Sequence, residues 1–187
     1  MQVILTKGGT LNPNANTIAA IARAVPGSLW LIGNEPDRIA LQDDVIPVQY
    51  ARVYHQAYET LKQADPTALV AIAGVVQPTP LRLKYLDAVL AAYQQLYSAP
   101  MPVDVWNVHN FILREERGSW GAEIPPGLPD AFGMLSAVDD NDNLETFKYK
   151  SGRFVGGCAT EASRINHWLY LSMAFSCRRT MDSGRSV

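Results

Sequence analysis

The chain has 187 residues, 48% of them hydrophobic, which is enough to bury the core of one domain. Its formal net charge of −2 gives no reason to expect binding to nucleic acid or to an anionic membrane. Two Cys do not form a disulfide framework. The opening MQVILTKGG turns polar too soon for a signal peptide, and no apolar run is long enough to span a membrane. As written, the chain carries no export address and is expected in the cytoplasm, although the sequence leaves its final location unknown.

Short apolar runs alternate with segments of helical spacing through most of the chain. Strands are predicted at 2–6, 29–32, 69–74 and 103–109. A first helix is expected to begin at a cap formed by Asn16 or Thr17, a second follows Pro47, and a third opens at Thr79-Pro80. This alternation predicts an α/β fold in which parallel strands alternate with helices.

The stretch LWLIGNEPD, residues 29–37, delivers an Asn and a Glu into a polar turn directly after a buried strand. Four apolar residues in a row suit a parallel strand covered on both faces, and Gly33 ends the run. Pro36 keeps Glu35 from continuing into a helix. Asn34 and Glu35 would then lie at the carboxyl end of a strand, where catalytic groups lie in a (β/α)8 barrel. On the plainer interpretation, these residues form only a solvated turn.

A strand followed by Gly-Asn-Glu-Pro resembles the fourth-strand motif of glycoside hydrolase clan A, the retaining (β/α)8 glycosidases. The resemblance covers residues 2–148 and implies a partial (β/α)8 TIM barrel made of about strands three to six. It further implies that Glu35 is the catalytic acid/base and that Asn34 binds the 2-hydroxyl of the sugar. The implied activity is hydrolysis of O-glycosidic bonds by a retaining, two-carboxylate mechanism. A complete barrel typically has roughly 250 residues, and this chain is shorter.

A His ends the predicted strand at 103–109, in the sequence VWNVHNF. Many members of the clan have His-x-Tyr at the end of strand six, lining the sugar subsite, so the resemblance implies that His109 contacts substrate. Phe111 stands where the Tyr is expected, and the Tyr hydroxyl near the nucleophile is therefore absent. On the alternative interpretation, His109 is a hydrogen-bonded structural residue at a strand end.

The stretch from 110 to 137 is rich in Gly and Pro and contains Trp120. Loops of this length without their own secondary structure are usually functional or disordered. In a glycosidase this loop would wall the sugar cleft, with Trp120 as a stacking platform that binds substrate. Alternatively, Trp120 only pins the loop to the body of the domain.

No metal site and no cofactor are expected. The Asp- and Asn-rich run at 139–143 looks similar to a calcium loop, but Leu144 replaces the central Gly and Lys150 stands at the position of the bidentate Glu. A cap for a helix that begins near Leu144 explains this run better. The three His lack metal-ligand spacing, and the sequence contains no Cys-x-x-Cys.

The residues after Lys150 differ in composition from the rest. All twelve Pro lie at or before Pro129, whereas both Cys lie after Lys150. The clan's nucleophile is a Glu at the end of strand seven, but the Glu that follows here, Glu161, comes after Gly-Gly and not after a strand. Back-translation of residues 156–173 in a shifted frame permits a strand ending in Ser-Glu-Tyr-Gly, similar to that strand. We therefore hypothesise a frameshift near 148–150, which would make 149–187 an atypical and poorly ordered tail.

The sequence thus predicts a partial glycosidase-like domain at 1–148 that takes a carbohydrate substrate, with no nucleic-acid or membrane partner. Self-association through open barrel edges is expected. The chain itself is predicted to be inactive, because the nucleophile is missing. A first alternative is a non-catalytic carbohydrate-binding or scaffold protein on a degenerate barrel. A second is an unrelated α/β enzyme in which Glu35, Asp37 and His109 bind a metal.

Overall fold

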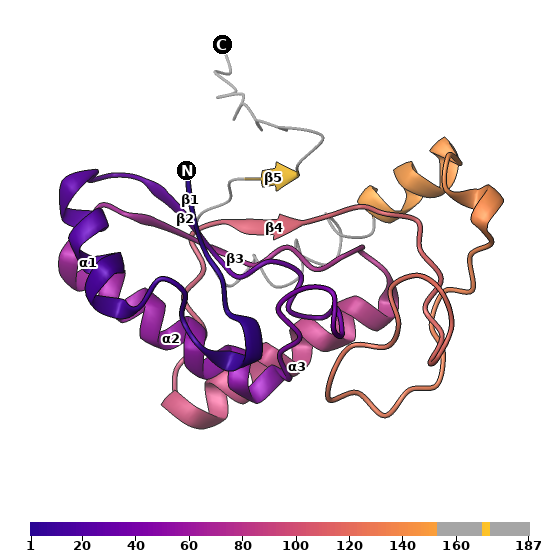
Figure 1. The fold of residues 1–187 in the computed structure, drawn as a ribbon, viewed down its shortest axis with the longest axis horizontal. Helices are drawn as coiled ribbons and strands as arrows, with labels where there is room; N and C mark the ends of the chain where they lie inside the picture. Colours follow the sequence, from indigo (N-terminus) through magenta and orange to yellow (C-terminus); the bar gives the residue numbers. More distant parts are fainter. Residues whose placement is uncertain (153–169, 173–187) are drawn as a thin grey trace, which may run out of the picture.

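A computed structural model of the chain describes residues 1–152 and the backbone of residues 170–172. Short strands alternate with helices along this part of the chain (Figure 1). The strands are β1 (Gln2–Ile4), β2 (Leu29–Ile32), β3 (Leu69–Ile72), β4 (Trp106–Val108) and β5 (Tyr170–Ser172). The helices are α1 (Ala15–Ala24), α2 (Pro47–Ala64) and α3 (Pro80–Tyr97), with 3-10 helices η1 (Lys7–Gly9) and η2 (Val138–Asp140) and a helical segment at 144–152. The expectations for Glu161 and for most of the tail, 153–169 and 173–187, lie outside the described residues.

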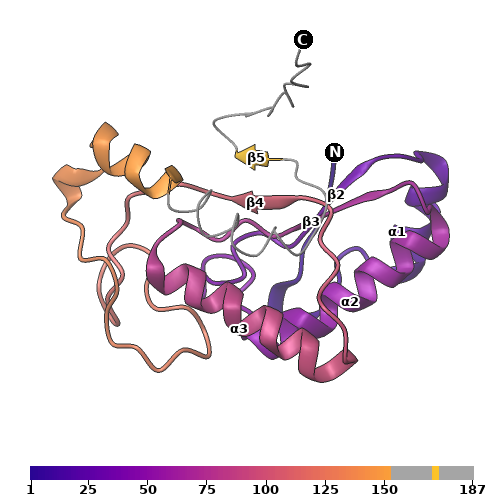
Figure 2. The same cartoon turned by 180° about the vertical axis from the view of Figure 1, so that it is seen from behind.

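The named strands pair in parallel, and neighbours in the sheet are neighbours in the chain. β2 lies between β1 and β3, in a register that places Leu29 opposite Leu69. A bridge from Ala71 to Val105 sets the start of β4 beside β3, and β5 pairs with β4. The helices α1, α2 and α3 all lie on one face of the sheet (Figures 1 and 2). The predicted fold class is confirmed: this is an α/β fold of parallel strands that alternate with helices. The sheet order follows the chain order, as it does in part of a (β/α)8 barrel.

Side-chain caps and prolines set where the helices begin. The side chain of Asn14 caps α1 by accepting a hydrogen bond from the amide of Thr17 at 3.1 Å. The cap expected at Asn16 or Thr17 is therefore wrong, because both residues lie inside the first helical turn. The second and third helices begin as predicted, with Pro47 in the first turn of α2 and Thr79 as the cap of α3.

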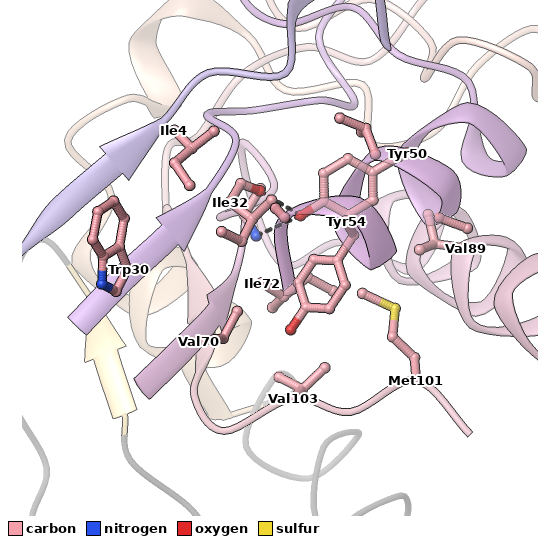
Figure 3. Packing of buried hydrophobic residues seen from close by; sticks show 14 of the residues in the cluster. Ile4, Trp30, Ile32, Tyr50, Tyr54, Val70, Ile72, Val89, Met101 and Val103 are labelled. Carbon is pink, nitrogen blue, oxygen red and sulfur yellow. Dashed lines mark hydrogen bonds between the residues drawn. The ribbon is translucent and has the colours of Figure 1, made fainter. Parts of the chain in front are cut away.

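The main core lies between the sheet and α2 (Figure 3). The helix-facing strand residues Ile4, Ile32 and Ile72 are all 0% exposed. The buried hydroxyl of Tyr50 donates to the carbonyl of Ile32 at 2.6 Å and accepts from the amide of Ala73 at 2.8 Å. One side chain of α2 thus ties the last residue of β2 to the residue after β3 and fixes the carboxyl ends of both strands.

The opposite face of the sheet is apolar and only partly covered. Leu31, Ala71 and Val105 form a second, smaller buried cluster on it. Val3 and Leu69, which alternate onto the same face, remain 46% and 39% exposed. In a complete barrel, side chains of further strands fill this space. Self-association through open barrel edges stays a prediction.

The helical segment at 144–152 begins at the cap that the Asp- and Asn-rich run predicted, since the side chain of Asn143 accepts from the amide of Thr146 at 2.9 Å. The segment runs past the domain boundary expected at 148/149, and Lys150 on it is 0% exposed. Within the described ranges, no helix is long and apolar enough to cross a membrane.

Candidate functional site

β1 and β3 each end two residues earlier than predicted, because the residues after them bond to residues of other loops rather than to the sheet. One carboxylate oxygen of Asp43 accepts from the amide and the hydroxyl of Thr6, at 2.9 and 2.7 Å, and from the amide of Asn34 at 2.9 Å. Gly33, at φ 98°, lies so close that a Cβ there would stand 2.8 Å from the Thr6 hydroxyl and 3.1 Å from the same Asp43 oxygen. A glycine is therefore required for the sharp turn after β2.

Glu35 occupies a left-handed backbone conformation, with φ 47°, which costs a non-glycine residue about 1–3 kcal/mol. Its amide donates to the carbonyl of Gly74 at 3.1 Å, so the turn after β2 is bound to the end of β3. The residue is only 3% exposed. Strained backbone of this kind concentrates at functional sites, and here it accompanies a buried carboxylate at the end of a parallel strand.

The carboxylate of Glu35 is held by two basic side chains. One oxygen lies 2.6 Å from Nδ1 of His109, just after β4, and the other accepts from Nη1 of Arg38 at 3.3 Å. Burial alone would raise the pKa of Glu35, but the hydrogen bonds and charges of His109 and Arg38 together outweigh burial and hold the pKa below its ordinary value. Glu35 is therefore a carboxylate at neutral pH. The structure brings Glu35 and His109, both predicted site residues, into direct contact.

Gly74 leaves the space that this contact needs. A Cβ at this position would stand 2.9 Å from Cδ2 of His109 and 3.0 Å from the side-chain nitrogen of Asn107. Any larger residue would push the imidazole away from Glu35. The absence of a side chain at Gly74 is therefore part of the site geometry.

Asn34 directly precedes Glu35 and is partly buried, but its side chain is already hydrogen-bonded within the chain. Its Nδ2 donates to the side-chain oxygen of Gln42 at 2.9 Å. To bind a sugar hydroxyl, as the resemblance implies, Nδ2 would exchange or share this bond. The role of Asn34 stays a prediction.

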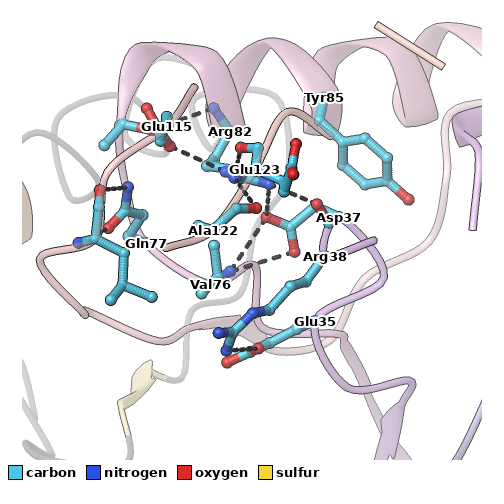
Figure 4. A network of polar contacts seen from close by, with 12 residues as sticks. Glu35, Asp37, Arg38, Val76, Gln77, Arg82, Tyr85, Glu115, Ala122 and Glu123 are labelled. Atoms are coloured by element: carbon cyan, nitrogen blue, oxygen red, sulfur yellow. Dashed lines mark hydrogen bonds and ion pairs between the residues drawn. The ribbon is translucent and has the colours of Figure 1, made fainter. Parts of the chain in front are cut away.

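A fully buried Arg links the turn after β2 to the long loop (Figure 4). Arg82 of α3 donates from Nε to Glu115 at 2.9 Å, and from Nη1 to the carboxylate and the carbonyl of Asp37 at 3.1 and 2.5 Å. Its Nη2 donates to the carbonyls of Ala122 and Glu123 at 2.7 and 2.5 Å. The three charged side chains are 0% exposed, so the guanidinium is surrounded by acceptors that fix the loop to the domain.

Asp37 faces this Arg and not the Glu35–His109 pair. Burial raises the pKa of Asp37 to about 6, although Arg82 and the amide of Val76 act in the opposite direction. A metal shared by Glu35, Asp37 and His109 does not fit this arrangement. Among the residues that the structure describes, no group of three His, Cys, Asp or Glu is placed to hold a metal ion.

Comparisons with known proteins give one similarity. No family model matches the chain, and no curated protein matches it. A solved structure, that of a GH128 (subgroup II) endo-β-1,3-glucanase from Sorangium cellulosum, is similar with a TM-score of 0.45 and 18% identity over 90% of this chain and 55% of that chain. The chain thus spans about half the length of this protein. Function is therefore inferred from the side chains of the site itself.

Trp120, the predicted stacking platform, lies in the loop that Arg82 fixes and is 40% exposed. The next residue, Gly121, has φ 107°, and a Cβ there would stand 2.5 Å from the carbonyl oxygen of Arg114. The loop is thus tightly folded around Trp120, whose ring is left partly open to solvent. Its role in binding stays a prediction.

Two residues that organise the site, Arg82 and Arg38, are not among the site residues that the sequence predicts. Arg82 stands among apolar positions of α3, where Leu81 and Leu86 are buried, and a charge inside an apolar helix face is a signal of a buried ion pair. Arg38 carries a weaker signal, since it only follows Glu35 by three residues in a turn.

Proposed function

We propose that this chain carries the acid/base half of a retaining O-glycosidase site, with Glu35 as the group that exchanges a proton with the glycosidic oxygen. The observation that carries this proposal is the 2.6 Å contact between the buried Glu35 carboxylate and His109, at the carboxyl ends of parallel strands. Polar groups that converge at these strand ends are the usual location of catalysis in (β/α)8 folds. A carbohydrate is the substrate that this proposal implies.

A retaining glycosidase needs a second carboxylate about 5–5.5 Å from the first. Within the described residues, the other buried acids already have partners: Asp37 and Glu115 bind Arg82, Asp43 binds Thr6, and Asp65 accepts from Gly27 and Thr67. None of the four is placed as a free nucleophile. We therefore expect little or no hydrolysis by the described part of the chain alone.

The charge state of Glu35 in the free protein decides whether this side chain can act as a base or as an acid. Because His109 and Arg38 hold its pKa below the ordinary value, Glu35 is set to accept a proton. To act as an acid, Glu35 would first have to take up a proton. Substrate that displaces Arg38 would remove a positive charge that lowers the Glu35 pKa, and the exclusion of water would raise that pKa further. We infer that bound glycan and Arg38 compete for the same carboxylate oxygen.

An α-glycosyl fluoride tests the base role without requiring a nucleophile. The acceptor hydroxyl gives its proton to Glu35, the acceptor oxygen bonds to the anomeric carbon, and the C–F bond breaks to release fluoride. We expect coupled oligosaccharide from α-glucosyl fluoride and a glucan acceptor, but little hydrolysis of aryl β-glucosides. The variant Glu35→Gln should couple at least about 100-fold more slowly. The matched control is Glu59→Gln, on the exposed face of α2, which should couple like wild type.

The second candidate is a non-catalytic glycan-binding protein, favoured by the fact that both oxygens of Glu35 already bind basic side chains. In that case glycan affinity would be the same in wild type and Glu35→Gln, and no coupling would be seen in either. Fluoride release that does not depend on Glu35 would contradict the acid/base proposal.

A further inference from the structure

We propose that Phe111 is a stacking platform for a sugar ring bound beside the Glu35–His109 pair. This inference rests on the proposed function and names the class of ligand: a pyranose that presents an apolar C–H face. Such a face occurs on sugars whose hydroxyl groups are mostly equatorial, as in β-glucans. No role in ligand binding was predicted for Phe111 from the sequence.

The position of the Phe111 ring carries the inference. The ring meets the imidazole of His109 edge to face, with centroids 6.1 Å apart and planes at 85°. The same imidazole contacts Glu35 at 2.6 Å, so Phe111 is one side chain removed from the candidate acid/base. It nevertheless remains 49% exposed. Phe111 and Glu35 therefore contact the same imidazole.

The backbone of Phe111 is held on both sides. Its amide donates to the carbonyl of Val76 at 3.4 Å, and its carbonyl accepts from Nζ of Lys150. Lys150 is 0% exposed and also donates to the side chain of Gln77 at 3.2 Å. The neighbouring Asn110 donates to the carbonyl of Phe147 at 3.0 Å, on the same helical segment as Lys150.

An exposed aromatic ring on a fixed backbone suits ligand binding better than packing. Burial of a Phe side chain contributes to stability, but half of this surface remains in water. A rigid aromatic residue loses little conformational entropy when a ligand stacks on it. A buried Lys, which is costly to desolvate, holds the backbone of this exposed residue in place. The arrangement is therefore explained by a ligand that covers the ring.

Binding of neutral tetrasaccharides to the full chain tests the proposal. Isothermal titration calorimetry with laminaritetraose, cellotetraose, mannotetraose and xylotetraose would identify the best ligand for the wild type. For that ligand, Phe111→Ala and Phe111→Leu should raise the Kd about tenfold or more, since both lose the aromatic face. Phe111→Tyr and Phe111→Trp, which keep an aromatic face, should stay within about threefold of wild type.

The matched control is Phe132→Ala, because Phe132 is an even more exposed aromatic residue, 64%, on the same long loop. It should leave the Kd unchanged. Equal affinity of wild type and Phe111→Ala would overturn the stacking role alone and leave the role of Glu35 intact. If none of the four sugars binds the wild type, the stacking role falls together with the proposed function. Thermal unfolding of each variant separates lost binding from lost folding.

Discussion

Glu35 and His109 lie 74 positions apart in the chain, yet the carboxylate of one and Nδ1 of the other are 2.6 Å apart. The contact joins the turn after β2 to the end of β4, across the end of β3. It needs Gly74, which leaves room for the imidazole, and a left-handed backbone at Glu35. The candidate site is thus formed by three strand ends, none of which suffices alone.

Removing His109 should weaken the effect of acid on stability. The Glu35 pKa lies below its ordinary value in the folded protein, so its contribution to stability is fully present above the unfolded pKa and is lost as the pH falls through the folded pKa. His109→Asn removes the main group that opposes burial, so the Glu35 pKa should rise. At pH 6 the variant should lose about 1.5–3 kcal/mol, the usual contribution of a hydrogen bond to a charged group. Urea unfolding between pH 3 and 6 measures both effects.

The control for this variant is His55→Asn. His55 also bonds to a side chain, the hydroxyl of Tyr93 at 2.9 Å, but that partner is neutral. Its loss should cost about 0.5–1.5 kcal/mol. An identical pH dependence for the two variants would show that Glu35 is not stabilised by His109.

Arg82 and Lys84 lie on the same helix and form ion pairs of very different burial. Arg82→Met leaves Asp37 and Glu115 buried without their cation and should destabilise the protein by about 3–5 kcal/mol. Lys84→Met removes an exposed pair with Asp130 and should cost at most about 1 kcal/mol. Chemical unfolding at pH 7 compares them. Similar costs for both would mean that the loop does not depend on Arg82.

The parts of this fold that can be predicted are those set by neighbouring residues in the sequence. Strands and helices were located by apolar runs, prolines and caps such as Thr79, which act over a few residues. The Glu35 turn was also located, because Gly33 and Pro36 mark it. The partner of each charge was not predictable in the same way: Arg82 meets Asp37 across 45 positions, and Lys150 meets Gln77 across 73. Such contacts depend on how the strand ends are stacked.

The first helix cap and the lengths of the strands were predicted less well. Propensity alone does not choose among three nearby capping residues, and the extended backbone of Asn14 decided the start of α1. β1 and β3 end early because Thr6 and Gly74 bond to Asp43 and Glu35, residues on other segments. Side-chain and loop contacts therefore override the apolar runs at the ends where the site forms.

Because of Lys150, the protein should become more stable as the pH rises above about 8. Burial lowers its pKa from 10.5 to about 8, although Glu115 acts in the opposite direction. A lysine with a lowered pKa favours the folded state above its unfolded pKa, and this contribution is lost as the pH falls to about 8. Relative to Lys150→Met, the wild type should therefore gain on the order of 1 kcal/mol between pH 8 and 9.5. A constant difference over this range, measured by urea unfolding, would show that Lys150 is not buried.

Gly74→Ala tests the space on which the Glu35–His109 contact depends. The new methyl group would stand 2.9 Å from Cδ2 and 3.1 Å from Nε2 of His109, so the imidazole must shift. We expect a loss of roughly 1–3 kcal/mol, typical of overpacking, and a rise in the Glu35 pKa, measured by NMR of the carboxyl carbon. Gly152→Ala is the control, since that helical position has nothing within 4 Å of an added Cβ and should become slightly more stable. If Gly74→Ala leaves the Glu35 pKa unchanged, the contact tolerates the methyl group, and Gly74 is not required for the site.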